Sequence, residues 1–304
     1  MKYVVSGYIG FDNFGDEAIA HVLTQKLKQN GAEKITLISS NPSRTSELHN
    51  VDSCGMFKFL PALINSDVLI SGGGSLLQDV TSLKSLLYYL VVIFSALILG
   101  KKVEIFAQGI GPINSSFGQM LTKLALKKAD KISVRDDNSQ KLLKEWGIDS
   151  ELVNDPVLDL ELPHKNSKGI VGIQLRSFPS LTEDFIEKLA EKIANKFKDK
   201  KIEVISLQDS IDLNVCNSFL EKLKQKGIEN IELKCGLSIQ EAIDTISNLE
   251  YLVAMRFHAN IIGIKSGIKT VAINYDPKVE TLAQKFNLPL IELDENKFSI
   301  LDNV

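Results

Sequence analysis

The sequence is poor in the residues that mark several classes of protein. Its 304 residues include 3 cysteines, and Cys54, Cys216 and Cys235 lie far apart with no CxxC pair. This pattern predicts reduced thiols in a cytoplasmic protein, and it argues against a disulfide framework or a zinc site built on cysteine. Proline is also sparse, with 8 residues against 19 glycines. Collagen-like and disordered chains are therefore excluded.

Basic charge is not in excess, and the histidines are scattered. The chain carries 35 Lys and Arg residues against 38 Asp and Glu residues, a net charge of −3. A protein that coats nucleic acid normally has a basic surplus, so we expect no nucleic-acid partner. His21, His49, His164 and His258 form no HxH or HxxxH pattern. The sequence therefore predicts no metal site.

A hydrophobic run long enough to span a membrane is lacking too, and the N-terminus does not resemble a signal peptide. The most apolar segment is LLYYLVVIFSALILG, from Leu86 to Gly100, flanked by Lys84, Lys101 and Lys102. Two interpretations remain open: a buried helix of an α/β domain, or a helix that also touches the inner leaflet. The second predicts salt-sensitive binding to anionic vesicles, weakened by changing Lys101 and Lys102 to Glu. We expect a cytoplasmic protein, peripheral on the inner face of the membrane in the second case.

What the sequence does contain is a repeating order of strand, turn and amphipathic helix. This alternation predicts an α/β fold with parallel sheets covered on both faces. The predicted strands are Tyr3–Ser6, Ile35–Ser39, Val68–Ser71, Val103–Ala107, Ile132–Val134, Ile170–Leu175, Ile202–Leu207, Ile231–Leu233, Tyr251–Met255 and Thr270–Ile273.

Helix start and stop signals lie between these strands. Apolar residues recur every four positions over 185–197, behind a Ser-x-x-Glu pattern at 180–183 that predicts a capping box. The same pattern at 238–241 predicts another helix start. A helix over 136–146 should end at Gly147, which is suited to a left-handed residue after the last turn.

The alternation breaks once, over Asp155–Lys168 (DPVLDLELPHKNSK), and we place a domain boundary there. We expect an N-terminal α/β domain over 1–160 and a C-terminal α/β domain over 165–304. The last 20 or so residues are expected to pack back on the first domain. The prediction is of two Rossmann-like doubly wound domains facing across a cleft, with ligands at the carboxyl ends of strands.

Three glycine-rich loops follow predicted strands, over 7–16, 71–75 and 108–112. Their spacing is not GxGxxG, so a dinucleotide fingerprint is not supported. Glycine lets a backbone approach a ligand closely, and the triple glycine of SGGGS favours that interpretation. The alternative is a set of tight turns that bind nothing.

Arg135 stands where another predicted strand ends. Its planar guanidinium suits a carboxylate or a phosphate. It could instead form an ion pair with Asp136, Asp137 or Asp155. Both interpretations stay open at this point.

The segment MRFHAN follows the strand Tyr251–Met255 and places Arg256 and His258 at the start of a helix. Free backbone N–H groups, a guanidinium and a titratable imidazole together suit an anionic ligand. No acidic residue occurs between Glu250 and Asp276. Lys278 follows the next strand and is expected at the same edge. The alternatives are a structural histidine and a solvated lysine.

The motifs SGYIGFDNFGDEAI, SGGGSLLQD, AQGIGPI, SVRDDNS, NDPVL, MRFHA and YDPKV occur in this order. In them the chain resembles the polysaccharide pyruvyl transferases, most closely the bacterial cell-wall (CsaB) type that pyruvylates a secondary cell wall polymer in S-layer anchoring. The resemblance runs from Tyr3 to about Leu288. It implies a fold similar to glycosyltransferase B (GT-B), phosphoenolpyruvate as donor co-substrate, and no other cofactor. It also implies a sugar diol as acceptor, usually N-acetylmannosamine in a lipid-diphosphate-linked saccharide.

The resemblance also implies the catalytic residues. They are Arg135 in SVRD, Arg256 and His258 in MRFH, and Lys278 in YDPKV, all of them donor-binding as well. Many relatives have Leu where this chain has Phe257, a departure that bears on the acceptor. Phosphoenolpyruvate carries a phosphate and a carboxylate, which the three cations could neutralise without a metal.

Ketal formation needs a proton on the methylene carbon, and His258 is the natural donor. Asp16 or Asp155 could deprotonate the sugar hydroxyl. We expect Asn260 to join the donor site. The expected acceptor-binding residues are Gly10, Asn13, Asp16, Gly73, Gly74, Gln108 and Asp155.

Two other functions remain open. A nucleotide-sugar glycosyltransferase or epimerase shares this architecture, although no glutamate stands near His258 to bind a ribose. A silent member could act as a binding subunit, but Arg256, His258 and Lys278 argue against it. The oligomeric state is not predicted.

Overall fold

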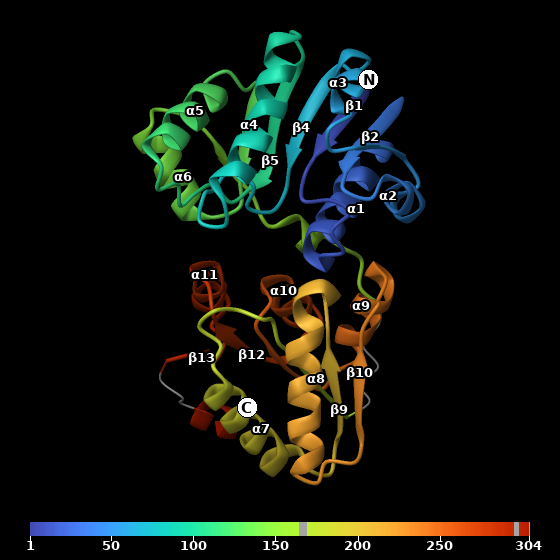
Figure 1. Cartoon of the computed structure of the whole chain (residues 1–304), viewed down its shortest axis with the longest axis vertical. Coiled ribbons are helices and arrows are strands. Elements are labelled where there is room, and N and C mark those ends of the chain that lie inside the picture. The colour runs from blue at the N-terminus through green and yellow to red at the C-terminus, as the bar shows by residue number, and fades with distance from the viewer. Residues whose placement is uncertain (164–168, 295–297, 304) are drawn as a thin grey trace. The chain divides into compact units, whose positions relative to one another are not determined.

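The computed structural model describes residues 1–163, 169–294 and 298–303. The chain divides into two compact units, Met1–Leu160 and Glu161–Val304 (Figure 1). The division falls inside the segment 155–168, of which residues 164–168 lie outside the described residues. Each unit is built around one parallel sheet. The predicted α/β class with two parallel-sheet domains is therefore confirmed.

The first unit has a seven-stranded sheet in the order β3-β2-β1-β4-β5-β6-β7. Its central part, 3-2-1-4-5-6, is the doubly wound order whose connections reverse direction between β1 and β4. The strands are β1 (Lys2–Ser6), β2 (Lys34–Ser39), β3 (Asp52–Gly55), β4 (Val68–Gly72), β5 (Lys102–Gln108), β6 (Lys131–Val134) and β7 (Glu151–Leu152).

Helices cover both faces of this sheet, because successive residues of a strand point to opposite faces. Ile70 of β4 packs in the same apolar cluster as α1, whereas Leu69 packs with α3, α4, α5 and α6. The helices are α1 (Phe14–Gln29), α2 (Pro42–His49), α3 (Phe59–Ile64), α4 (Leu83–Ile98), α5 (Ser116–Leu126) and α6 (Asp137–Glu145), and a short 3-10 helix, η1 (Pro156–Asp159), follows β7.

The second unit has a six-stranded parallel sheet in the order β10-β9-β8-β11-β12-β13. Its strands are β8 (Ile170–Gln174), β9 (Lys201–Ile205), β10 (Ile231–Lys234), β11 (Tyr251–Ala254), β12 (Lys269–Asn274) and β13 (Leu290–Glu292). Its helices are α7 (Glu183–Phe197), α8 (Asp209–Gln225), α9 (Ile239–Ser247), α10 (Phe257–Lys265) and α11 (Pro277–Phe286), with a 3-10 helix, η2 (Phe298–Asn303).

All ten predicted strands are present, with ends within two residues of the prediction. The strands that the sequence did not predict are β3, β7 and β13. Each has two to four residues and lies at or next to the edge of its sheet. Strands this short carry too few residues to show a period of two.

The helix signals gave one error. Ser238 and Glu241 form the predicted capping box, and Gly147 ends α6 with a left-handed φ of +69°. The predicted capping box at 180–183 is wrong, because the N-cap is Thr182, whose side chain accepts the N–H of Phe185. Thr182 lies one residue before the helix and can therefore reach its third residue, which Ser180 cannot.

The apolar segment 86–100 forms most of α4, and its inner side packs on the sheet. Leu86, Leu90 and Ile93 are fully buried. Val91 and Ile98 are exposed on the same helix. In the described part of the chain, no helix has the length and hydropathy to cross a membrane.

The C-terminal residues that the structure describes pack within their own unit. Phe298 and Leu301 of η2 join the core of the second unit, and the Phe298 ring lies 5.0 Å from that of Phe185 on α7. Lys192 of α7 pairs with Asp302 at 2.6 Å. Apolar side chains of residues 298–303 thus complete the core beside α7, and the packing of the last residues on the first unit stays a prediction. Residues 295–297 and 304 lie outside the described residues.

Candidate active site

Three neighbouring strands of the second sheet end at cationic and aromatic side chains, among them Arg256, His258 and Lys278, which the sequence predicts as site residues. Arg176 follows β8, Arg256 and His258 follow β11, and Tyr275 and Lys278 follow β12. β11 lies between β8 and β12 in the sheet. The carboxyl ends of parallel strands meet at one edge, so the structure brings these side chains to a common region, where such sheets bind ligands.

Arg256 is buried in a bidentate ion pair. Its Nε donates to Oδ2 of Asp212 at 2.6 Å, and its Nη2 donates to Oδ1 at 2.7 Å. Nη2 also donates to Oε1 of Gln208 at 3.0 Å. These contacts use three of the five N–H donors of the guanidinium. No hydrogen bond of the Nη1 group is found among the described residues, so this group could bind a ligand. Arg256 thus joins the end of β11 to the start of α8.

Asp212 is itself held in place. It is fully buried, and its Oδ2 accepts the backbone N–H groups of Leu207 and Gln208 at 3.2 and 3.1 Å. Nε2 of Gln174 also donates to Oδ2, at 3.4 Å, and these five donors on one carboxylate offset the cost of burying its charge. The acid-free span noted in the sequence is therefore misleading, because tertiary packing supplies a carboxylate from another helix.

Two buried amides fix the backbone at Arg256. Oε1 of Gln174 accepts the Arg256 N–H at 2.7 Å. Nδ2 of Asn260 donates to the carbonyl oxygens of Ala254 and Arg256 at 3.2 and 3.1 Å. The structure places Asn260 beneath the loop, fully buried against backbone. In this position it orients Arg256 and His258.

Arg176 and Lys278 lie against the same aromatic ring. The guanidinium carbon of Arg176 is 5.5 Å from the centre of the Tyr275 ring, and Nζ of Lys278 is 5.8 Å from it. Arg176 also donates from Nη1 to the Tyr275 hydroxyl at 3.3 Å. Lys278 lies 3.5 Å from Asp276, which balances one of the two charges. A cation pair of this kind suits an anion with more than one negative charge.

His258 is the second residue of α10 and is half-buried. Its ring meets that of Phe257 edge to face, with centroids 5.1 Å apart. The first turn of a helix leaves backbone N–H groups free to bind an anion. His258 therefore stands where a proton donor and anion-binding groups occur together.

In the first unit, Arg135 forms one of the ion pairs that the sequence left open. Its Nη1 donates to Oδ2 of Asp155 at 2.6 Å, and its Nη2 donates to Oγ of Ser75 at 3.1 Å. The two charged side chains are 6% and 5% exposed. Oδ1 of Asp155 accepts the N–H of Val157 at 3.0 Å. Arg135 thus connects the ends of β6 and β4 with the chain after β7.

The triple glycine allows α1 to pack closely on its loop. A Cβ on Gly73 would lie 2.0 Å from Cγ2 of Ile19, and one on Gly74 would lie 2.6 Å from Oδ1 of Asp16. Both glycines have a positive φ, +68° and +70°. The approach of α1 is therefore one reason for glycine at these two positions, and their close contact with a ligand stays a prediction. Asp16 lies beside Gly74 at the carboxyl edge of this sheet.

The loop after β1 is tied to α1 and α2 by buried polar groups. Oε1 of Glu17 accepts the N–H of Gly10 at 2.7 Å, and its Oε2 lies 2.9 Å from Nε2 of His49. Asn13 caps α1, since its Oδ1 accepts the N–H of Gly15 at 3.1 Å. Glu17, which the sequence treated as an ordinary first-turn acid, is thus a buried residue that shapes the loop.

Gln108 is fully buried between two strand ends. Its Nε2 donates to Oγ of Ser71 at 2.8 Å, and its Oε1 has no hydrogen-bond partner among the described residues. An unpaired amide oxygen is costly when buried, so it is a group that a ligand hydroxyl could satisfy. Of the predicted acceptor-binding residues, Gln108 shows this feature most clearly.

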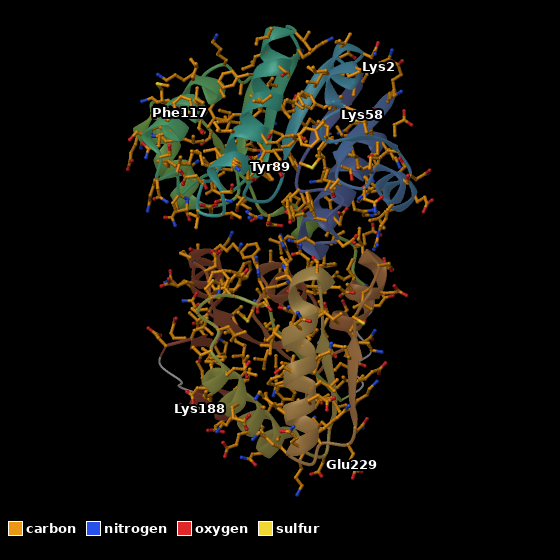
Figure 2. All side chains as sticks on the ribbon, in the orientation of Figure 1. Lys2, Lys58, Tyr89, Phe117, Lys188 and Glu229 are labelled. Atoms are coloured by element: carbon orange, nitrogen blue, oxygen red, sulfur yellow. The ribbon has the colours of Figure 1, made fainter. Side chains whose placement is uncertain are left out.

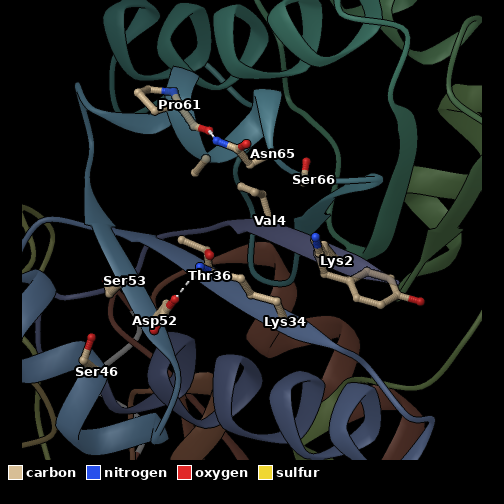
Figure 3. Close-up of a pocket in the computed structure, with 12 residues that line it drawn as sticks. Lys2, Val4, Lys34, Thr36, Ser46, Asp52, Ser53, Pro61, Asn65 and Ser66 are labelled. Atoms are coloured by element: carbon tan, nitrogen blue, oxygen red, sulfur yellow. Dashed lines mark hydrogen bonds and ion pairs between the residues drawn. The ribbon is translucent and has the colours of Figure 1, made fainter.

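The first unit also has a pocket of about 380 Å³, which lies at the other edge of the sheet (Figure 3). Lys2, Lys34 and Asp52, the first residues of β1, β2 and β3, line it. Lys34 and Asp52 form an ion pair at 2.8 Å within it. The amino edge of a doubly wound sheet is not where its ligands bind, so we do not assign the reaction to this pocket.

A comparison with protein families gives one match over most of the chain. The family model described as polysaccharide pyruvyl transferase matches residues 13–277. The chain belongs to the polysaccharide pyruvyl transferase family. The matched segment includes Arg135, Arg256 and His258 and ends one residue before Lys278. A comparison with curated protein sequences finds no match.

Solved structures similar to this pyruvyl transferase have the GT-B fold. They include UDP-GlcNAc 2-epimerase from Neisseria meningitidis bound to UDP-GlcNAc, with 12% identity, a TM-score of 0.65, and coverage of 100% of this chain and 90% of that chain. The S. aureus MnaA–UDP structure has 10% identity, a TM-score of 0.68, and coverage of 100% and 87%. Anabaena Alr3699/HepE with UDP and glucose has 13% identity, a TM-score of 0.62, and coverage of 100% and 88%. Identities this low support the fold alone.

Two residues of the candidate site, Arg176 and Asp212, were not predicted from the sequence. Arg176 directly follows the predicted strand Ile170–Leu175, so the rule that pointed to Arg135 and Lys278 would have found it. Asp212 gave no such signal, because it lies inside α8, 44 residues from Arg256 along the chain.

Proposed function

We propose that this pyruvyl transferase moves the pyruvyl group of phosphoenolpyruvate onto two hydroxyls of a sugar as a ketal and releases phosphate. The observation that carries the proposal is the group of cations at the ends of β8, β11 and β12. Phosphoenolpyruvate has a phosphate and a carboxylate on neighbouring positions, and it needs cations at two points.

Arg176 and Lys278 are the cations best suited to bind these two groups. They approach one ring from two strands, and a single carboxylate, that of Asp276, contacts Lys278. Arg256 contributes its remaining N–H donors and the orientation of the loop. Fixed positive groups stabilise the charge that develops on the departing phosphate.

The reaction begins with proton transfer from His258 to the methylene carbon of phosphoenolpyruvate. The central carbon then becomes electrophilic, and one sugar hydroxyl attacks it and loses its proton. The C–O bond to phosphate breaks, and the second hydroxyl adds to the same carbon, losing its proton as the ring closes. Of the two hydroxyl protons, one replaces the proton that His258 gave to the new methyl group and the other leaves with phosphate, so the products are a cyclic ketal and hydrogen phosphate.

Asp16 is the better candidate for the base that receives a hydroxyl proton. Both oxygens of Asp155 accept hydrogen bonds, and its side chain is buried beside Arg135. Asp16 lies at the carboxyl edge of the first sheet and is less buried. We propose a lipid-diphosphate-linked saccharide as acceptor, with N-acetylmannosamine as the pyruvylated sugar.

A second candidate is a nucleotide-sugar glycosyltransferase or epimerase. The observation in its favour is that similar structures contain UDP, UDP-GlcNAc or UDP and glucose. Against it, the carboxylate that contacts Arg256 in the loop after β11 is that of Asp212, which is fully buried and already paired, so it is poorly suited to bind a ribose hydroxyl.

The test is incubation of the whole chain with phosphoenolpyruvate and synthetic disaccharides that end in N-acetylmannosamine, with and without a lipid diphosphate. Phosphate release and product mass are read together. The expected product is heavier than the acceptor by a pyruvyl ketal. A parallel arm offers UDP-sugars. Their turnover, without phosphate release from phosphoenolpyruvate, would establish the second candidate instead.

A further inference from the structure

Three neighbouring helices of the first unit carry exposed apolar side chains. α3 and α5 both pack against α4, and their inner residues share one core cluster. On their outer sides, large apolar residues are exposed to solvent. They are Phe57, Leu60, Ile64, Val91, Ile98, Leu99, Phe117, Met120 and Leu124; we call these nine residues the apolar face.

The apolar face follows the periods of the helices. Phe117, Met120 and Leu124 of α5 are spaced by three and four residues and therefore lie on one side of the helix. Val91 and Ile98 of α4 are two turns apart and lie on one side as well. Phe57 is 90% exposed, and its ring contacts that of Tyr88 on α4, with centroids 6.3 Å apart. Figure 2 labels Phe117 and Lys58 on this unit.

The segments that form the apolar face carry charges of a single sign, although Asp79 binds the backbone N–H groups of Asn114 and Ser115 at the start of α5. Segments 53–66, 80–103 and 105–129 contain α3, α4 and α5 and have no Asp or Glu. The rest of the unit has many acidic residues, so the asymmetry belongs to this face. The lysines in these segments are Lys58, Lys84, Lys101, Lys102, Lys123, Lys127 and Lys128.

One of these lysines, Lys101, is held by hydrogen bonds within the fold and is less available to a membrane. Nζ of Lys101 donates to the carbonyl oxygens of Ile64 and Ser66 at 2.9 and 2.7 Å, just where α3 ends. Changing Lys101 to Glu would therefore disturb α3. Lys127 is a better probe, because it is exposed at the end of α5, next to Leu124.

We propose that the apolar face binds the surface of a membrane rich in anionic phospholipid. Apolar side chains would enter the acyl boundary, while the lysines meet lipid phosphates. A second copy of the chain fits less well, since a twofold contact would set these lysines against one another, and segments 53–66, 80–103 and 105–129 supply no carboxylate to pair them. Nucleic acid would leave the apolar side chains without a partner.

The test is sedimentation of the full chain with vesicles of two compositions. One is phosphatidylcholine alone, and the other is phosphatidylcholine with phosphatidylglycerol. We expect binding to the anionic vesicles at low salt, little binding to the neutral ones, and loss of binding at high salt.

Matched variants separate the face from the rest of the molecule. Lys127→Glu should weaken binding about fivefold or more, the effect of losing one lysine at a membrane surface. Lys198→Glu is its control, because Lys198 is an exposed C-cap of α7 in the second unit. Phe117→Ser with Met120→Ser should weaken binding at least tenfold, about what the lost apolar burial predicts. Leu152→Ser, an exposed apolar residue on β7, should leave it unchanged.

The proposal is overturned if the unmodified chain does not bind anionic vesicles at low salt, or if each variant binds like its control. Analytical ultracentrifugation without lipid tests the competing occupant. The face would be assigned to self-association if the unmodified chain forms a dimer and does not bind vesicles, and if Phe117→Ser with Met120→Ser dissociates that dimer. Vesicle binding needs no substrate, so its outcome is independent of whether the proposed reaction occurs.

Discussion

At the scale of single residues, the arginines at the strand ends do two different things. Arg135 and Arg256 are buried in ion pairs with Asp155 and Asp212. They hold strand ends together, and breaking such a pair leaves an uncompensated charge. Arg176 contacts the hydroxyl and the face of Tyr275 and forms no ion pair with a described carboxylate. Of these three arginines, Arg176 is therefore the one whose charge is most available to bind phosphoenolpyruvate.

His258→Ala tests the proposed proton donor. We expect turnover to fall about 10²–10⁴-fold, the usual range for losing a general acid, because the methylene carbon would no longer be protonated by the protein. The affinity for phosphoenolpyruvate should change much less, since the cations remain. Steady-state phosphate release gives both quantities. Turnover within a few-fold of the unmodified enzyme would remove His258 from this role.

Arg256→Lys and Arg176→Lys form a pair that should differ in their effect on stability. Lysine cannot bind Asp212 in a bidentate way, so Arg256→Lys should lower the free energy of unfolding by about 1.5–3 kcal/mol, the value of a charged hydrogen bond. It should also raise the Michaelis constant for phosphoenolpyruvate. Arg176→Lys should raise that constant with little loss of stability. Chemical denaturation gives the stability of both variants, and steady-state kinetics give their Michaelis constants for phosphoenolpyruvate. Equal losses of stability in the two variants would contradict the prediction.

At the scale of elements, short local devices set where the helices begin and how closely they pack. The glycines of the loop after β4 let α1 reach that loop, and Glu17 ties the loop after β1 to α2. The cap of α7 is a single threonine. The glycines and Glu17 thus join a loop to another element, whereas Thr182 acts within its own helix.

Gly73→Ala tests the role of the triple glycine. An alanine there has a left-handed φ, which costs about 1–2 kcal/mol, and it overlaps Ile19, which costs about 1–3 kcal/mol more. Gly100→Ala is the control, because Gly100 has a similar φ of +66° with no atom within 4 Å of the added Cβ. Only the backbone cost should appear there. Equal losses in the two variants, measured by denaturation, would show that α1 moves away freely.

Thr182→Ala tests the cap of α7. Removing the hydroxyl that accepts the Phe185 N–H should cost about 1 kcal/mol of stability. Ser180→Ala should be nearly neutral, since Ser180 is not the N-cap. Urea denaturation of the two variants decides between them, and a larger loss from Ser180→Ala would restore the capping box predicted at 180–183.

At the scale of the whole molecule, the two units have different outer surfaces. The first unit carries the acid-free face of α3, α4 and α5. The second binds its lysines to carboxylates on several outer elements, as in the ion pairs of Lys188, Lys201 and Lys222. The net charge of −3 conceals this difference. Each unit has its own core, so each is expected to unfold as its own cooperative unit.

The stability of the first unit should depend on His21 at mildly acidic pH. Burial lowers the pKa of His21 below 6.5, and the nearby His49 and Lys28 lower it further. The unfolded chain therefore takes up this proton more readily, so stability should fall as the pH drops below about 6.5. His21→Gln should flatten the dependence between pH 7.5 and 5.5. Denaturation curves at the two pH values check it, and an unchanged slope in the variant would falsify the assignment.

Much of the fold follows from the sequence by itself. Ten strands were predicted because a buried parallel strand is a short continuous apolar run, and the turns and caps between them have local residue preferences. The strand-end rule then pointed to His258 and Lys278, since in a parallel sheet every strand presents its carboxyl end at the same edge. These are properties of neighbouring residues, and a single sequence displays them.

Only the tertiary structure decided which charges are paired and which glycines make room for a helix. Asp212 binds Arg256, which is 44 residues away along the chain. Ile19 of α1 packs against Gly73 in the loop after β4. No local pattern encodes such contacts, because they depend on which elements the sheet order places side by side. The short strands β3, β7 and β13 belong here too, since two to four residues at a sheet margin are ordered by the strand beside them.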